Sequence, residues 1–160
     1  MTKAPNTKPR FQPRKHAAKC SEDAPVVVED QPLPEKVAAT PVEQKSAAQW
    51  AYERLILYIK NFEEQLDNEH EVAMGFTGGD AGVLRIEGIG FFDPDVITFY
   101  GTDQSGARTQ LIQHVSQLSV MLRALPVAVE AEAPKRIGFR LAAELEDTQD
   151  EDPEDGSEEG

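Results

Sequence analysis

The acidic side chains best placed to bind a metal ion are Asp93 and Asp95, which flank Pro94, and Asp103 further along the chain. Carboxylates are good ligands for Ca²⁺ and Mg²⁺, but a calcium loop supplies about six to eight oxygens and carries a glycine and a distal glutamate at fixed spacing. That spacing is missing here. Pro94 instead presets a turn in which neighbouring aspartates bond the backbone. We therefore expect turn-forming aspartates and no bound metal at these positions.

The groups that could cradle a phosphate or act as a nucleophile lead to the same expectation. Gly78-Gly79-Asp80-Ala81-Gly82 is rich in glycine, but a phosphate loop is followed by a helix or a Lys-Ser/Thr pair, and a strand pattern follows here. His16, His70 and His114 form no HExxH pair, and the single cysteine, Cys20, excludes an intramolecular disulfide. The sequence predicts no catalytic residue, no metal and no cofactor. A small metal-dependent or hydrolytic enzyme, with a site assembled across the fold, is the alternative.

Hydrogen-bonding side chains are concentrated between residues 113 and 117, where a predicted strand meets a predicted helix. The apolar neighbours Leu111 and Val115 fit the core however this segment folds, so the polar groups are expected near the rim of the domain. We predict that Gln113, His114 and Gln117 bind a partner. For His114 the alternative is a capping or partly buried histidine.

One amphipathic helix opens the ordered part of the chain, over residues 47–68. Ser46 and Gln49 fit a capping box, and apolar residues recur behind them at helical spacing. The period then changes to two, which predicts strands over Glu71–Thr77 and Val83–Phe92. The glycine-rich segment between these strands is expected to be a turn.

Three further features continue a predicted antiparallel meander. The apolar positions of the second strand change face near its glycines, which indicates a bulge at Gly88 or Gly90. A third strand is expected over Val96–Gly101, and residues 103–106 fit a hairpin loop closed by a glycine in the left-handed region.

The segment after this loop can be read in two ways. Its leucines fall at steps of three and four, so one helix could begin near Thr109. The preceding hairpin favours instead a fourth strand over residues 107–113 and a helix over residues 114–125, ended by Pro126. Residues 136–141 then form a short apolar segment docked on the domain. The predicted fold is α+β: an N-terminal helix, a four-stranded antiparallel meander and a second helix.

Two tails flank the predicted domain at residues 46–141. Residues 1–45 are rich in proline and poor in apolar residues, so a disordered leader is expected, and residues 142–160 are expected to be a disordered acidic tail. The net charge is −13, yet residues 1–20 carry six basic and no acidic side chains. Without an apolar run long enough for a membrane span or a secretory signal, we expect a cytoplasmic protein that does not bind a membrane.

Nucleic acid is not the expected partner of the domain. The order helix–meander–helix resembles that of a double-stranded RNA-binding domain, but the predicted second helix offers only Arg123 and the domain is net acidic. The basic residues 1–20 could still bind nucleic acid weakly and without sequence preference.

Residues 48–141 also carry motifs that are similar to those of a bacterial family known as a domain of unknown function, which implies one folding unit and no assigned activity. The segments that carry the resemblance are Met74-Gly75-Phe76, Asp80-Ala81-Gly82-Val83-Leu84-Arg85-Ile86-Glu87-Gly88, Phe92-Asp93-Pro94-Asp95, Thr98-Phe99-Tyr100-Gly101, Gln110-Leu111-Ile112-Gln113-His114-Val115-Ser116-Gln117-Leu118 and Arg136-Ile137-Gly138-Phe139. The function expected from the sequence is a non-catalytic protein-interaction module that binds a protein partner or a second copy of itself.

Overall fold

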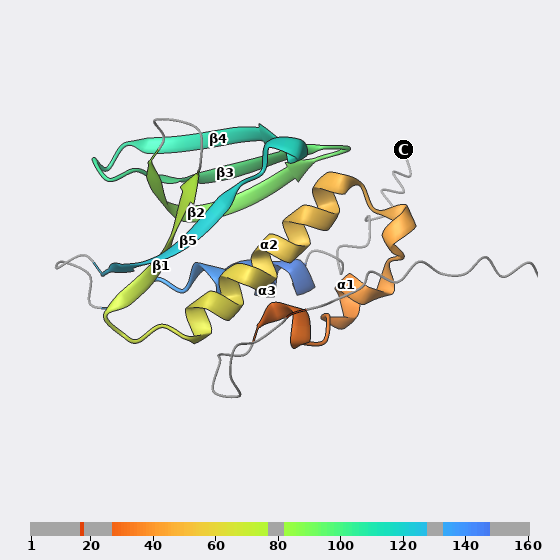
Figure 1. The fold of residues 1–160 in the computed structure, drawn as a ribbon, viewed down its shortest axis with the longest axis horizontal. Helices are drawn as coiled ribbons and strands as arrows, with labels where there is room; N and C mark the ends of the chain where they lie inside the picture. The colour runs from red at the N-terminus through yellow and green to blue at the C-terminus, as the bar shows by residue number, and fades with distance from the viewer. Residues whose placement is uncertain (1–16, 18–26, 77–81, 128–132, 148–160) are drawn as a thin grey trace, which may run out of the picture.

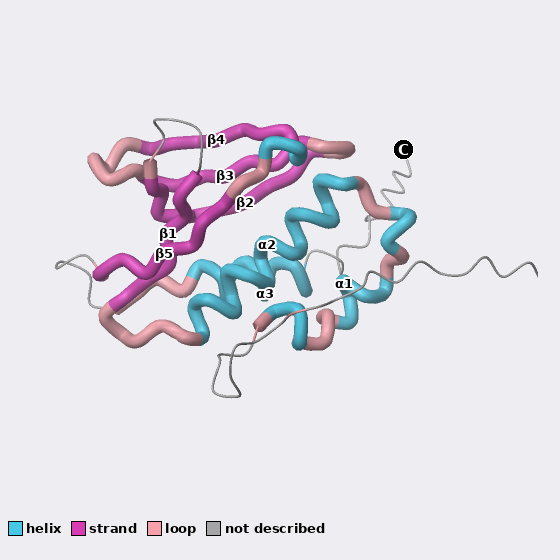
Figure 2. Tube along the Cα trace, in the orientation of Figure 1, coloured by secondary structure: helices cyan, strands magenta, loops and turns pink. Residues whose placement is uncertain are grey.

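The computed structural model describes residues 17, 27–76, 82–127 and 133–147. Within them, a five-stranded antiparallel sheet packs against helices that lie on one of its faces (Figure 1, Figure 2). The α+β class and the antiparallel sheet are as predicted. The turn predicted at residues 78–82 lies outside the described residues except for Gly82.

The first long helix is α2 (Ala47–Glu64), close to the range predicted from the apolar periodicity. Ser46 is its N-cap, and its hydroxyl accepts a hydrogen bond from the Gln49 N–H at 3.0 Å. This bond satisfies one of the amide groups that a helix start leaves without an intrahelical partner. Ile56 and Ile59 are fully buried from α2 against the sheet.

The four strands predicted as a meander are confirmed. They are β1 (His70–Phe76), β2 (Val83–Phe92), β3 (Val96–Thr102) and β4 (Arg108–His114), and each pairs with the next one antiparallel. The register shifts between Ile86 and Gly88, so the extra residue is Glu87, directly before the first of the two predicted glycines. Gly106 closes the β3–β4 loop at a φ of +85°, a conformation that favours glycine.

The helix predicted over residues 114–125 is wrong. A 3₁₀ turn, η3 (Val115–Gln117), is followed by a fifth strand, β5 (Val120–Pro126), which pairs antiparallel with β1 and gives the strand order β4-β3-β2-β1-β5. Leu118, Val120 and Leu122 satisfy a period of two as well as the helical steps, and the open edge of β1 decides between them. Along that edge seven residue pairs are formed with β5.

Part of the predicted leader is helical in the structure. Residues 27–45 contain η1 (Val28–Asp30), α1 (Glu35–Ala39) and η2 (Val42–Gln44), and Val37 of α1 is buried. Lys45 forms an ion pair of 2.9 Å with Glu53 of α2, and both side chains are almost completely buried. This pair and the apolar side chain of Val37 fix residues 35–45 on the helices, which differs from the disorder expected there.

The last helix, α3 (Ile137–Asp147), contains the segment predicted to dock at residues 136–141 and continues beyond it. It lies against α2, where the buried carboxylate of Glu63 accepts hydrogen bonds from the backbone N–H groups of Gly138 (2.9 Å) and Phe139 (3.2 Å). A Cβ atom at Gly138 would lie 2.7 Å from the Lys60 backbone nitrogen. Glycine therefore allows the two helices to approach closely enough for the carboxylate to cap α3.

Among the described residues, no helix combines the length and the apolar character that crossing a bilayer requires.

Candidate functional site

Three strands present one face that no described helix covers. In the register of β2, β3 and β4, the residues of this face stand in three rows that cross the sheet. We call it the open face; its rows are Gly88, Tyr100 and Gln110, then Gly90, Thr98 and Ile112, then Phe92, Val96 and His114. Both α2 and α3 lie on the opposite side of the sheet (Figure 1).

The exposure of alternate residues along the strands separates the two faces. Ile97 and Phe99 of β3 point toward the helices and are fully buried. On the open face, Phe92 is 76% exposed, Ile112 64% and Tyr100 43%. Large apolar side chains gathered on a surface mark contact sites more often than single scattered ones do. The open face is therefore the described surface best suited to bind another protein.

Tyr100 lies flat across the open face because its neighbours on β2 are glycines. A Cβ atom at Gly88 would be 3.6 Å from the ring atom Cδ2, and one at Gly90 would be 3.7 Å from Cε2. The Tyr100 hydroxyl also accepts a hydrogen bond from the hydroxyl of Thr98 at 3.3 Å. The two glycines thus leave room for a flat, oriented aromatic ring, which presents both apolar surface and a polar group.

His114 occupies one corner of the open face, and both of its ring nitrogens have partners. Nδ1 accepts from the Ser116 N–H at 3.1 Å, and Nε2 lies 2.8 Å from Oδ2 of Asp95. Because Nδ1 accepts, Nε2 carries the proton that is donated to Asp95. The imidazole thus holds the Asp95 carboxylate at this corner.

The three residues predicted to bind a partner do not form one cluster. His114 is on the open face, whereas Gln113 is paired with Ile97 and belongs to the side of the sheet that faces the helices. The Gln113 Oε1 is buried and has no hydrogen-bond partner among the described residues. Gln117 is exposed at the end of η3.

Sequence reasoning missed Phe92, Tyr100 and Ile112 as surface residues. Their signal is present in the pairs Phe91-Phe92 and Leu111-Ile112, where neighbouring residues of one strand are both apolar. Since neighbours in a strand point to opposite faces, one member of each pair must leave the core unless the sheet is covered on both sides.

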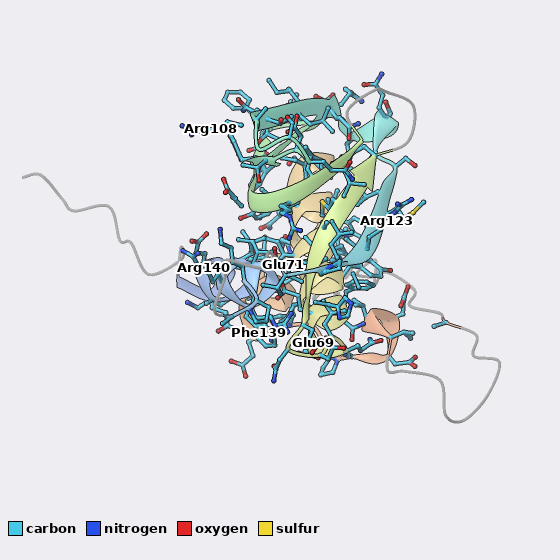
Figure 3. The ribbon with its side chains drawn as sticks, turned by 90° about the vertical axis from the view of Figure 1, so that its left-hand side faces the viewer. Glu69, Glu71, Arg108, Arg123, Phe139 and Arg140 are labelled. Atoms are coloured by element: carbon cyan, nitrogen blue, oxygen red, sulfur yellow. The ribbon has the colours of Figure 1, made fainter. Side chains whose placement is uncertain are left out.

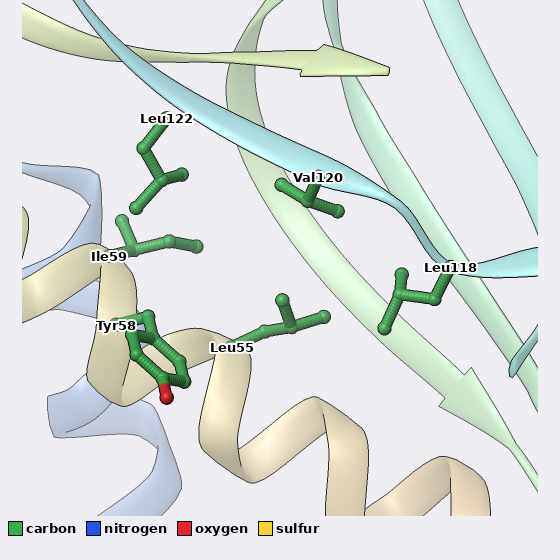
Figure 4. Close-up of a pocket in the computed structure, with 6 residues that line it drawn as sticks. All are labelled: Leu55, Tyr58, Ile59, Leu118, Val120 and Leu122. Carbon is green, nitrogen blue, oxygen red and sulfur yellow. The ribbon is translucent and has the colours of Figure 1, made fainter. Parts of the chain in front are cut away.

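A second apolar feature is a pocket of about 310 Å³ between α2 and β5 (Figure 4). All its lining side chains except that of Tyr58 are aliphatic, and the Tyr58 hydroxyl donates to the Glu29 carboxylate. This hydrogen bond raises the pKa of Tyr58 to about 12, so the phenol stays neutral. The side chains that line the pocket therefore provide an apolar surface, and none of them is charged at neutral pH. Its lining residues are Leu55, Tyr58, Ile59, Leu118, Val120 and Leu122.

The aspartates considered as metal ligands have separate local partners. Asp93 accepts from the Ser46 hydroxyl, Asp95 from His114, and Asp103 from groups of its own loop, which lower the pKa of Asp103. No group of three or more histidine, cysteine, aspartate or glutamate side chains in the described part of the chain could hold a metal ion.

Comparisons with known proteins give one positive result. A search of the curated proteins and a search of the solved structures each found no similar protein. A family model, by contrast, matches residues 42–140, from just before α2 into α3, which is most of the chain. The chain therefore belongs to a family of unknown function, DUF6173.

Proposed function

We propose that this chain is a non-catalytic protein-interaction module of a bacterial cytoplasm and that it binds a protein through the open face. The observation that carries the proposal is the exposure of Phe92, Tyr100 and Ile112 on a sheet face that no described helix covers. Burying apolar surface of this kind contributes about 25 cal/mol per Å². A partner that covers the open face would gain that free energy without requiring the fold to change.

The arrangement of polar groups around the apolar residues supports the same proposal. Gln110 and Thr98 lie between the large side chains, and the His114–Asp95 pair closes one corner. Protein interfaces commonly have an apolar centre and a polar rim that supplies hydrogen bonds. On this proposal His114 and Gln117 act at the rim, and Gln113 acts by supporting the edge of β4 from the helical side.

The experiment compares two matched variants of the full-length protein. Phe92→Ser removes the most exposed aromatic ring of the open face, and Phe139→Ser removes an exposed aromatic ring from α3 as the control. Both tagged variants and the wild type are used to capture proteins from a native lysate, with thermal melts run in parallel. We expect proteins captured by the wild type and by Phe139→Ser to be missing with Phe92→Ser. Equal capture by all three proteins would refute the role of the open face.

The rim residues are tested separately with the double variant His114→Ala and Gln117→Ala. We expect the same captured proteins to be reduced while the melting temperature changes little, because surface substitutions usually change stability by about 0.5 kcal/mol or less. Unchanged capture would remove these two residues from the proposed interface. A large loss of stability would show that they support the fold.

A further inference from the structure

We propose that a second copy of the same chain joins the sheet edge to edge through β4, beside the open face, in an antiparallel, two-fold symmetric pair. Edge pairing extends the open face without covering it, so this inference goes beyond the proposed function. It follows from the backbone groups of β4 that do not bond to β3, from the register that pairs them, and from the side chains which that register brings together.

The hydrogen bonds at both ends of β4 show which of its backbone groups bond to β3 and which do not. Val115 N–H donates to the Asp95 carbonyl at 2.7 Å, and Asp103 N–H donates to the Ala107 carbonyl at 3.0 Å. In an antiparallel pair the hydrogen-bonded positions alternate, so the odd-numbered residues of β4 bond to β3. The N–H and C=O groups of the even-numbered residues point away from β3, and β4 is the last strand on that side among the described residues. These outward residues are Arg108, Gln110, Ile112 and His114.

Only one antiparallel register between two copies pairs all four outward residues. It places the two-fold axis at Leu111, so that Arg108 pairs with His114 of the second copy and Gln110 pairs with its Ile112. Each such pair exchanges two backbone hydrogen bonds, which gives about eight bonds across the axis. A shift of the axis to Gln110 or Ile112 leaves at least one outward residue of each copy without a partner.

The side chains brought together by this register are complementary. Directly paired residues of neighbouring strands lie on the same face of a sheet, and successive pairs alternate between the two faces. The open faces of the two copies therefore join into one continuous surface. The two Ile112 side chains become diagonal neighbours across the axis, within reach of each other. The exposed side chain of Ile112, in the middle of an edge strand, thereby gains an apolar contact.

Charge complementarity favours the same pairing. Arg108 is exposed and forms no ion pair with any described residue, and in the symmetric pair it lies opposite the His114–Asp95 corner of the second copy. The interface therefore places the Arg108 guanidinium of each copy near the Asp95 carboxylate of the other copy. The rest of β4 is uncharged, and like charges are not brought face to face.

The other edge of the sheet lacks these properties. The bond from Val127 N–H to the Glu69 carbonyl makes the even-numbered residues of β5 the outward ones, and the last of them, Pro126, has no N–H to donate. Arg108 and Arg123 mark the β4 and β5 strands in Figure 3, at separate places on the molecule. An edge that contains proline is protected against pairing, whereas β4 contains none.

The first test measures the mass of the full-length protein by light scattering and by sedimentation over a range of concentrations. We expect a dimer that dissociates on dilution. Ile112→Lys should raise the dimer dissociation constant roughly five-fold, because it replaces the apolar contact across the axis with two like charges. Met121→Lys is the matched control, since Met121 is an exposed apolar residue on the other edge strand. A wild type that stays monomeric, or an equal effect of both variants, would overturn the inference.

Four further variants test the register and the backbone pairing. Arg108→Glu and Asp95→Arg should each weaken the dimer, and the double variant should recover it because the opposite charges face each other again. Gln110→Pro removes an N–H that points away from β3, so it should weaken the dimer while leaving the melting temperature of the monomer nearly unchanged. No recovery in the double variant would refute the register.

The results also separate this inference from the proposed function. Suppose that the chain is monomeric and that Phe92→Ser still abolishes the capture of other proteins. The proposed interaction module then stands, and the dimer is refuted. A dimer that is lost with Ile112→Lys and kept with Met121→Lys supports the inference. This holds even if Phe92→Ser leaves the captured proteins unchanged, a result that would refute the proposed function of the open face.

Discussion

Replacing Glu63 by alanine should destabilise the fold more than any neighbouring change on α2. The Glu63 carboxylate is only 2% exposed and holds the first turn of α3 through the N–H groups of Gly138 and Phe139. Alanine cannot accept either hydrogen bond. The first turn of α3 would lose its cap at the place where the two helices are closest.

The magnitude follows from the two lost bonds and the burial of the carboxylate. Hydrogen bonds to a charged group contribute about 1.5–3 kcal/mol each, so the gross loss is about 3–6 kcal/mol. Removing the carboxylate also removes the cost of burying it, which raises the pKa of Glu63 in the folded protein. We therefore expect a net loss of about 2–4 kcal/mol in the free energy of unfolding. For a domain of about 100 residues this corresponds to a decrease in Tm of roughly 10–20 °C.

The assay is urea unfolding of the full-length protein, followed through the fluorescence of its single tryptophan, Trp50, near the start of α2. Glu64→Ala is the matched control, because Glu64 is the next residue on the same helix and is exposed. Its effect should stay within about 0.5 kcal/mol. A Glu63→Ala variant as stable as the Glu64→Ala variant would refute the capping role of Glu63.

Three other predictions follow from buried charges and from the charge of the tails. Burial raises the pKa of Glu63, so the folded protein retains a proton that the unfolded chain releases. The free energy of unfolding should therefore fall as the pH rises from the ordinary carboxyl range through the folded-state pKa. Glu63→Gln should flatten this part of the pH profile in urea midpoints measured from about pH 4 to pH 8, and an unchanged slope would contradict the assignment. Lys45→Met should cost about 3 kcal/mol or more because it leaves Glu53 buried and unpaired, and adding Glu53→Leu should recover most of the loss in thermal melts; a double variant no more stable than Lys45→Met would oppose this account. Any binding to DNA or RNA should be confined to residues 1–20, with its six basic side chains, and should weaken steeply with salt in a fluorescence titration. Nanomolar, salt-resistant binding by a chain that lacks residues 1–20 would contradict it.

The elements that could be predicted from the sequence are those whose signals are local. The hydroxyl of Ser46, the alternation in β2 and the glycine of the Gly106 loop each act within a few residues, and the structure has α2, β2 and the β3–β4 hairpin where these signals indicate. The strand β5 could not be predicted in this way, because its apolar residues fit two periods. The choice was made by the free edge of β1, about fifty residues earlier in the chain.

The candidate site was predictable only in part for a related reason. Side-chain type suggested His114 as a surface residue, and it is one, but Gln113 is on the opposite side of β4 because neighbours in a strand alternate. Phe92 and Ile112 look like core residues in a sequence. Their exposure depends on which face the helices cover, and that depends on long-range packing such as that of Ile56 and Ile59 on the sheet.

The cap on α3 also sets an order of events during synthesis of the chain. Glu63 and Gly138 are 75 residues apart in the sequence. At about 5–20 residues per second, a ribosome needs roughly 4–15 s to make the segment between them. During that interval the face of α2 that later meets α3 has no helix to cover it, and the carboxylate of Glu63 remains hydrated. Closure of the fold must therefore wait until α3 has left the ribosome, and a nascent chain stopped before Gly138 exposes an apolar helix face that chaperones can bind.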